Sequence, residues 1–176
     1  MNLLHDIPAG SPEEINVIVE IPKGSHNKYE VDKETGMIKL DRANYGAAPY
    51  PFEYGFVPQT HWEDGDALDV MLLATYPIPS GILVPARPVA LMEMTDGGEP
   101  DSKVIAVPVG DRRFEHIQDL KDLNPHSLQE YKHFFETLKQ LKGKPAVVEV
   151  HGFKGRAEAL QAVEHGMALY KKEFSK

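Results

Sequence analysis

The stretch Glu63-Asp64-Gly65-Asp66-Ala67-Leu68-Asp69-Val70, or EDGDALDV, is the segment around which the fold is organised. Its Asp64-Gly65 step predicts a tight turn, because glycine accepts positive φ and aspartate can hydrogen-bond its own backbone. The chain then enters the apolar run 68–74, which has the length of a strand. Asp69 lies inside that run, so the sequence predicts a carboxylate within a buried strand.

A carboxylate in such a place needs compensation. Burying it is costly unless a cation, a proton or several donors accompany it, and Asp64 and Asp66 add further repulsion. A divalent metal ion would relieve both problems, and all-oxygen ligands favour a hard ion such as Mg²⁺. A solvated acidic turn explains Asp64 and Asp66 alone equally well, whereas Asp69 favours the metal site. An EF-hand loop is excluded, because Asp69 stands where that motif requires glycine.

Composition narrows the function further. At 176 residues, with 41% hydrophobic and 26% charged residues, we expect one soluble globular domain spanning residues 1–176. The absence of cysteine excludes disulfides, zinc–thiolate sites and thiol nucleophiles. The net charge of −8 counts against nucleic-acid binding. With neither a signal-peptide pattern nor an apolar run near the roughly 20 residues of a membrane span, we expect a cytoplasmic protein without membrane partners.

The periodicity of the chain predicts about six short strands followed by helix, strand and helix. Strands are expected at 15–21 (half-buried, ending at Pro22), 28–32, 37–42, 68–74, 82–94, 103–109 and 146–150. Helices are expected from Pro125 to Gly143 and along the apolar stripe between Leu160 and Phe174. The aromatic and proline-rich segment 45–58 is interpreted as an irregular loop. This order predicts an α+β fold with a strongly curved or closed sheet.

Charged residues alternate along 28–32. Lys28, Glu30 and Asp32 fall on one face of the predicted strand. That face is either the solvent side of an edge strand, which is the commoner case, or one wall of a charged cavity. The sequence leaves both interpretations open.

Taken together, the charged and aromatic positions form a recognisable order. They are Glu20, Lys28-Tyr29-Glu30, Arg42, Tyr50-Pro51, Tyr54-Gly55, Asp64-Gly65-Asp66, Asp69, Met94-Thr95-Asp96, Asp101, Lys103 and Phe134-Phe135-Glu136. In this order the chain resembles a family I soluble inorganic pyrophosphatase of the short prokaryotic type. The most specific part of the resemblance is the D-x-D-x-x-D signature at Asp64, Asp66 and Asp69, and the resemblance covers essentially the whole chain.

The resemblance implies a five-stranded OB-like barrel with two main helices packed outside it toward the C-terminus. It also implies Mg²⁺-dependent hydrolysis of pyrophosphate to two orthophosphates, and commonly a homohexamer. Mn²⁺ or Co²⁺ are alternative metals. The chemistry agrees with the residues, because attack by water on a compact polyanion needs its charge neutralised and the water activated.

The resemblance assigns five residues to metal ions. Asp64, Asp69 and Asp101 would hold the first ion, and Asp69 would bridge to a second. Asp96 and Asp101 would hold an ion that arrives with the substrate, and Glu30 would reach a further one through water.

The remaining roles concern water and phosphate. Asp66 matches the general base of the family, and Glu20 matches a carboxylate placed behind the metal ligands. The phosphate-binding positions are matched by Lys28, Arg42, Tyr54, Lys103 and Lys139.

Three positions depart from the family pattern. Ala67 stands where the family usually has proline or glutamate, which leaves the loop less stiff by about 0.4–1 kcal/mol of unfolded-state entropy. Leu138 stands before Lys139 where the family has tyrosine, so a phenol that helps to hold phosphate is missing. Phe153 replaces a frequent tryptophan, which we interpret as a packing variation.

Two other functions compete with pyrophosphate hydrolysis. One is a hydrolase of longer polyphosphates or of phosphoanhydride esters, although no nucleotide-binding glycine loop is visible. The other is an OB-like binding protein in which catalysis is weakened or lost, an alternative that the Leu138 departure leaves open.

Overall fold

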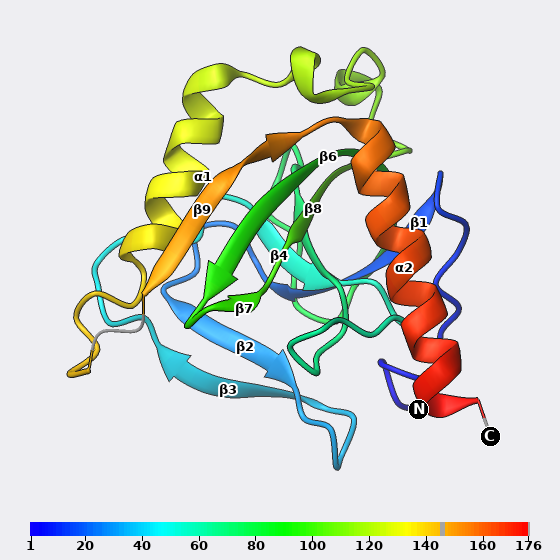
Figure 1. Cartoon of the computed structure of the whole chain (residues 1–176), viewed down its shortest axis with the longest axis horizontal. Coiled ribbons are helices and arrows are strands. Elements are labelled where there is room, and N and C mark those ends of the chain that lie inside the picture. The colour runs from blue at the N-terminus through cyan, green and yellow to red at the C-terminus, as the bar shows by residue number, and fades with distance from the viewer. Residues whose placement is uncertain (145–146, 176) are drawn as a thin grey trace.

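Five strands form a closed ring in the computed structural model, which describes residues 1–144 and 147–175. The ring order is β1 (Ile15–Ile21), β4 (Glu53–Phe56), β5 (Asp69–Leu72), β8 (Lys103–Pro108) and β6 (Leu83–Asp96). Pairing of β6 with β1 closes the ring, and β5 with β8 is its parallel pair. The long strand β6 also pairs with β7 (Glu99–Pro100) and β9 (Val148–Lys154). Figure 1 shows β9 lying along β6.

A separate hairpin stands beside the ring. It consists of β2 (Asn27–Val31) and β3 (Ile38–Ala43), which pair only with each other. In Figure 1 this hairpin projects below the ring, near the end at which β7 lies. It therefore adds a second wall to that end of the molecule.

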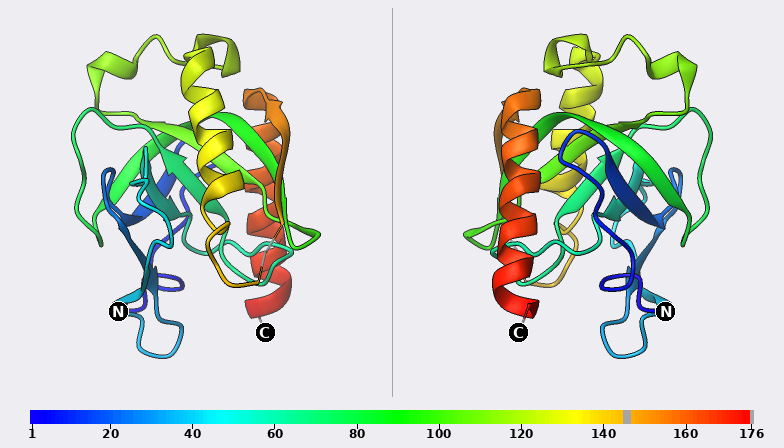
Figure 2. Two further views of the ribbon diagram at one scale, coloured as in Figure 1. Left: turned by 90° about the vertical axis from the view of Figure 1, so that its left-hand side faces the viewer. Right: turned by 90° about the vertical axis from the view of Figure 1, so that its right-hand side faces the viewer.

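The helices lie outside the ring. Two 3₁₀ turns, η1 (Arg112–Phe114) and η2 (Leu120–Asp122), lead into α1 (Pro125–Thr137), and α2 (Arg156–Phe174) follows β9. Figure 1 shows α1 and α2 on either side of β9, and Figure 2 shows both standing upright along the ring. No helix in the described residues is long and apolar enough to span a bilayer.

Two large apolar clusters hold these elements together. One packs α2 against the ring through Ala159, Ala162 and Val163, together with residues such as Val17 and Leu68. The other is aromatic and packs Phe134 and Phe135 of α1 against Tyr50, Phe52 and Tyr54. The rings of Phe52 and Phe135 stack with centroids 5.6 Å apart.

The predicted α+β class with two main helices is confirmed, and the sheet is mixed. The helix start predicted at Pro125 is also confirmed, since the Asn124 side chain accepts hydrogen bonds from the His126 and Ser127 N–H groups. The helix ends at Thr137 and not at the predicted Gly143. The chain between these two residues forms isolated turns. The strand predicted at 146–150 corresponds to β9, which extends past residue 150 to Lys154. Ala146 lies outside the described residues.

Two further predictions are wrong. The segment 45–58 contains the strand β4, which is buried on both faces between β1 and β5 and therefore shows no alternation. For the same reason β1 is almost fully buried and not half-buried. On α2 the buried residues are Ala159, Ala162, Val163 and Gly166, so the contact face uses small residues beside the predicted large-residue stripe.

Gly55 in β4 offers a test of the ring. A Cβ atom on this residue would lie 2.0 Å from the carbonyl oxygen of Ile18 in β1. We expect Gly55→Ala to reduce the free energy of unfolding by about 3 kcal/mol or more, because the backbones must separate. Urea denaturation measures this loss. Gly46→Ala is the control, since its Cβ would meet nothing within 4 Å, and equal stabilities of the two variants would contradict the close approach.

Candidate active site

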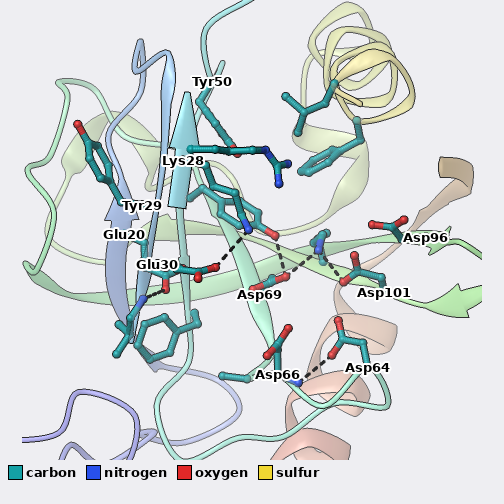
Figure 3. Close-up of a pocket in the computed structure, with 18 of the residues that line it drawn as sticks. Glu20, Lys28, Tyr29, Glu30, Tyr50, Asp64, Asp66, Asp69, Asp96 and Asp101 are labelled. Carbon is teal, nitrogen blue, oxygen red and sulfur yellow. Dashed lines mark hydrogen bonds and ion pairs between the residues drawn. The ribbon is translucent and has the colours of Figure 1, made fainter. Parts of the chain in front are cut away.

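One large pocket opens between the hairpin, the ring and the end of α1. It has a volume of about 760 Å³ and contains all twelve residues predicted from the sequence. These are Glu20, Lys28, Glu30, Arg42, Tyr54, Asp64, Asp66, Asp69, Asp96, Asp101, Lys103 and Lys139. Figure 3 shows the labelled carboxylates converging on it from several strands and from the loops before β5 and β8.

The topology explains how distant residues meet there. Val70 of β5 pairs with Val104 of β8, and because these strands are parallel, the preceding Asp69 and Lys103 are neighbours at the same end. The hairpin brings Lys28 opposite Arg42. The remaining positions come from β1, β2, β4, β6, the loops before β5 and β8, and the segment after α1.

Lys103 lies at the centre of the pocket. Its Nζ donates to Asp69 Oδ2 at 2.7 Å and to Asp101 Oδ1 at 2.6 Å, and the Tyr54 hydroxyl donates to the same Asp69 oxygen at 2.7 Å. Burial alone would lower the pKa of Lys103, but the two carboxylates raise it above its ordinary value. The ammonium is therefore fixed as a cation.

The two carboxylates beside Lys103 differ. Burial raises the pKa of Asp101 to about 7, an effect that Lys103 opposes and Asp69 reinforces. The side chain of Asp69 is 20% exposed, so the predicted burial of this residue is only partial. The cation that the sequence required beside Asp69 is present as Lys103.

Asp64 and Asp66 lie on the loop before β5. The tight turn predicted there is confirmed, since Gly65 has φ of 88° and donates its N–H to the Trp62 carbonyl. The Asp66 N–H donates to Asp64 Oδ1 at 3.0 Å. Burial raises the pKa of Asp64, and repulsion from Asp69 and Asp66 raises it further.

The side chain of Asp66 is 60% exposed and is ion-paired with Lys33, whose Nζ lies 2.7 Å from Asp66 Oδ1. Lys33 comes from the turn of the hairpin, and sequence analysis missed it. Its position in a predicted turn carried no sign that the turn reaches the acidic loop 33 residues away.

The hairpin forms a charged wall of the pocket, which favours the cavity interpretation of Lys28, Glu30 and Asp32. Lys28 Nζ lies 2.9 Å from Asp41 and 3.3 Å from Glu30. Burial would lower the pKa of Lys28, but these carboxylates raise it above its ordinary value. Asp41 is a second residue that sequence analysis missed.

Glu20 lies behind this wall. Its Oε1 accepts the Val31 N–H at 2.9 Å, and the residue is buried. Burial, followed by repulsion from Asp69, raises the pKa of Glu20 to about 8. This carboxyl therefore resists ionisation while the negative charge of the pocket is uncompensated.

The far side of the pocket is formed after α1. Lys139 Nζ lies 2.5 Å from Asp96 Oδ2. The neighbouring Leu138 lines the pocket and also packs against the aromatic cluster, so its side chain contacts both the site and the core.

The donor set suits a hard divalent cation. Ten Asp and Glu side chains line the pocket against six Lys and Arg side chains. Among the described residues no three His, Asp or Glu side chains stand close enough to enclose one ion by themselves. Mg²⁺ does not need such a cage, because it keeps several waters and is usually held by one or two carboxylates. The oxygen donors and the excess negative charge therefore fit the ion.

The fold and the pocket together define an α+β protein. Its site combines carboxylates of the kind that bind metal ions with cationic side chains of the kind that bind phosphate. Comparison with known proteins makes this specific. The family model for inorganic pyrophosphatase matches residues 17–171. The inorganic pyrophosphatase of Haloferax volcanii is 45% identical over 99% of both chains, and that of Thermus thermophilus is 46% identical over 96% of this chain and 98% of that one.

Solved structures agree. The crystal structure of inorganic pyrophosphatase from Thermus thermophilus has a TM-score of 0.93, covering 97% of this chain and 99% of that chain. The enzyme of Helicobacter pylori, at 38% identity, has a TM-score of 0.88 and covers 94% of this chain and 98% of that chain. The chain belongs to the inorganic pyrophosphatase family, in its family I short prokaryotic form. The expectation of an enzyme of this family is confirmed.

The pKa of Glu20 predicts a pH dependence of stability in the metal-free protein. The unfolded chain loses the Glu20 proton near pH 4.5 and the folded chain near pH 8, so stability falls as pH rises through this window. The slope is up to about 1.4 kcal/mol per pH unit. Glu20→Gln copies the protonated group and should remove this fall.

Urea denaturation between pH 5 and 8.5 in the presence of EDTA measures the effect. The difference in unfolding free energy between Glu20→Gln and the wild type should grow as pH rises. Glu13→Gln, at an exposed position, should follow the wild type. Parallel curves for Glu20→Gln and the wild type would show that the folded pKa is not raised.

Proposed function

We propose that this enzyme hydrolyses inorganic pyrophosphate to two orthophosphates in a Mg²⁺-dependent reaction. The observation that carries the proposal is the convergence of the twelve predicted residues on one pocket in a chain of this family. The small and densely charged site suits a compact polyanion. Mn²⁺ and Co²⁺ are substitutes with the same preference for oxygen ligands.

Five carboxylates would hold the metal ions. Asp64, Asp69 and Asp101 would bind the first, in part through the waters that the ion retains, with Asp69 shared by a second. Asp96 and Asp101 would bind an ion that enters with the substrate, and Glu30 another through water. When bound, the metal would neutralise phosphate charge and lower the pKa of the attacking water.

Asp66 is the proposed general base. It lies on the rim of the pocket, outside the Lys103 network, and its exposed carboxylate is accessible to water. Its contact with Lys33 is a solvent-exposed ion pair, which holds the side chain only weakly. Asp66 would take the proton from the attacking water at its free carboxylate oxygen.

The phosphate groups would be bound by Lys28, Arg42, Tyr54, Lys103 and Lys139. Arg42 supports this assignment independently of the family, because within the described residues its Nε is buried and has no acceptor. A buried donor without a partner is costly, and a phosphate oxygen would satisfy it. Glu20 would support this wall from behind through its bond to Val31.

We propose that the chain is one domain over residues 1–176 and that its ring of strands is an OB-like barrel. We also propose a cytoplasmic homohexamer, as the resemblance implies. Light scattering coupled to size-exclusion chromatography tests the subunit number.

A phosphate-release assay tests the function. Pyrophosphate should be hydrolysed with Mg²⁺ and not with EDTA, and tripolyphosphate should be a much poorer substrate. Faster release from tripolyphosphate than from pyrophosphate would favour the longer-polyphosphate alternative. The absence of release from either substrate with every divalent metal would contradict the proposed function.

The division of roles between Asp66 and Asp69 is testable. Asp66→Asn keeps the shape but removes the basic carboxylate, so we expect kcat to fall by about 10² or more. The Mg²⁺ affinity, measured by calorimetric titration, should change much less than in Asp69→Asn. Equal losses of metal affinity in the two variants would show that the roles are divided wrongly.

Leu138 gives another prediction, because it lines the pocket beside Lys139. Leu138→Tyr adds a hydroxyl donor, and a hydrogen bond to a charged oxygen contributes about 1.5–3 kcal/mol. We therefore expect KM or the phosphate inhibition constant to fall by about one to two decades. Leu128→Tyr, on α1 and against the same core cluster, is the control. If Leu138→Tyr only loses stability, the residue serves the core alone.

A further inference from the structure

The loop that carries Asp64 and Asp66 is closed on itself at two levels. We call residues 60–68 the acidic loop. At its base, the Thr60 hydroxyl donates to the Val57 carbonyl at 2.5 Å and accepts the Leu68 N–H at 2.9 Å. At its tip, the Trp62 N–H donates to the Asp66 carbonyl at 2.7 Å. The loop is therefore a compact unit that can be held from outside.

Helix α2 holds the base of this unit. The His61 N–H donates to the Gly166 carbonyl at 3.0 Å. A Cβ on Gly166 would lie 3.4 Å from Thr60 Cβ and 3.6 Å from Leu68 Cβ, so helix and loop pack with little space between them. Thr60, Leu68 and Gly166 are all buried. The base is thus fixed by packing that does not involve the pocket.

The same helix also holds the tip, through His165. Its Nε2 lies 2.6 Å from Glu63 Oε1, and its ring stands edge-on to Trp62 with centroids 5.3 Å apart. Glu63 directly precedes Asp64 in the chain. Figure 3 shows Asp64 and Asp66 beside the faint red coil of α2.

The contact with His165 contributes little to global stability. The side chains of Glu63 and His165 are 42% and 47% exposed, and even a fully charged pair at this exposure contributes only about 0–1 kcal/mol. Its effect on the reaction rate can be much larger than its effect on stability, because misplacing reacting groups by about 1 Å can cost about 10²-fold in rate. The contact at the tip adds little to the stability of the protein, but it lies next to Asp64 and therefore affects the position of that carboxylate.

We propose that His165 is a positioning residue for the active site, an inference that rests on the proposed function of Asp64 and Asp66. By holding Glu63 and Trp62, it fixes the orientation of the acidic loop toward the pocket. The buried base keeps the loop folded without it. Loss of His165 therefore frees the tip while leaving the ring and α2 in place.

Three variants test this role: His165→Ala removes the contact, His165→Gln keeps a side chain that can donate to Glu63, and Glu164→Ala alters the next exposed residue of α2. Hydrogen exchange in the metal-free protein reports on the loop without catalysis. We expect exchange of the Gly65 and Asp66 amides to be about tenfold faster in His165→Ala, with the β1 amides and the urea midpoint unchanged.

In the active enzyme, His165→Ala should raise the Mg²⁺ concentration for half-maximal activity about fivefold and lower kcat about tenfold. The KM for pyrophosphate should change less, because the phosphate-binding cations lie on other elements. His165→Gln should restore most of both values, and Glu164→Ala should match the wild type.

Several results would overturn the proposal. One is unchanged exchange at Gly65 and Asp66 in His165→Ala. Others are equal effects in Glu164→Ala, or a fall in the urea midpoint large enough to indicate a purely structural role. If the wild type fails to hydrolyse pyrophosphate, the proposed function fails, while the exchange measurement still decides whether His165 holds the loop.

Discussion

The site depends on one buried ammonium held between two carboxylates. Lys103 is 3% exposed, and without Asp69 and Asp101 its charge would be uncompensated in a low-dielectric pocket. Leaving such a charge unpaired costs several kcal/mol. The parallel pairing of β5 with β8 places Asp69 and Lys103 at the same end of the ring, so the backbone topology determines the electrostatics. Tyr54 completes the arrangement from β4.

The closed ring explains why the second wall of the pocket is a separate hairpin. With β1 paired to both β4 and β6, the ring offers no free strand edge there, and β2 and β3 pair with each other. The hairpin contributes Lys28, Glu30 and Arg42, while the ring strands and the segments that connect them contribute most of the carboxylates. Cations from one unit thus face an acidic surface of the other, an arrangement that leaves an anion-binding space between them.

The sequence predicted the acidic centre because a carboxylate inside an apolar run is a strong local signal, as Asp69 shows. The full residue set followed from the resemblance and its spacing. The strand β4 escaped prediction because burial on both faces removes the period-two pattern. The contacts Lys33–Asp66 and His165–Glu63 also escaped prediction, since partners 33 and 102 residues apart meet only through the tertiary fold. Sequence periodicity carries no information about such contacts.

The raised pKa values of Glu20, Asp64 and Asp101 share two causes. Burial and repulsion from neighbouring carboxylates both disfavour the charged forms. A pocket in this state holds protons that a divalent cation would displace, because the cation stabilises the ionised carboxylates. Binding of the proposed metal ion would then be coupled to proton release, and its affinity would rise with pH. The energetic cost of packing carboxylates together would therefore serve the proposed function. Protonation and Lys103 offset part of this cost in the metal-free protein, and the remaining negative charge would attract a divalent cation.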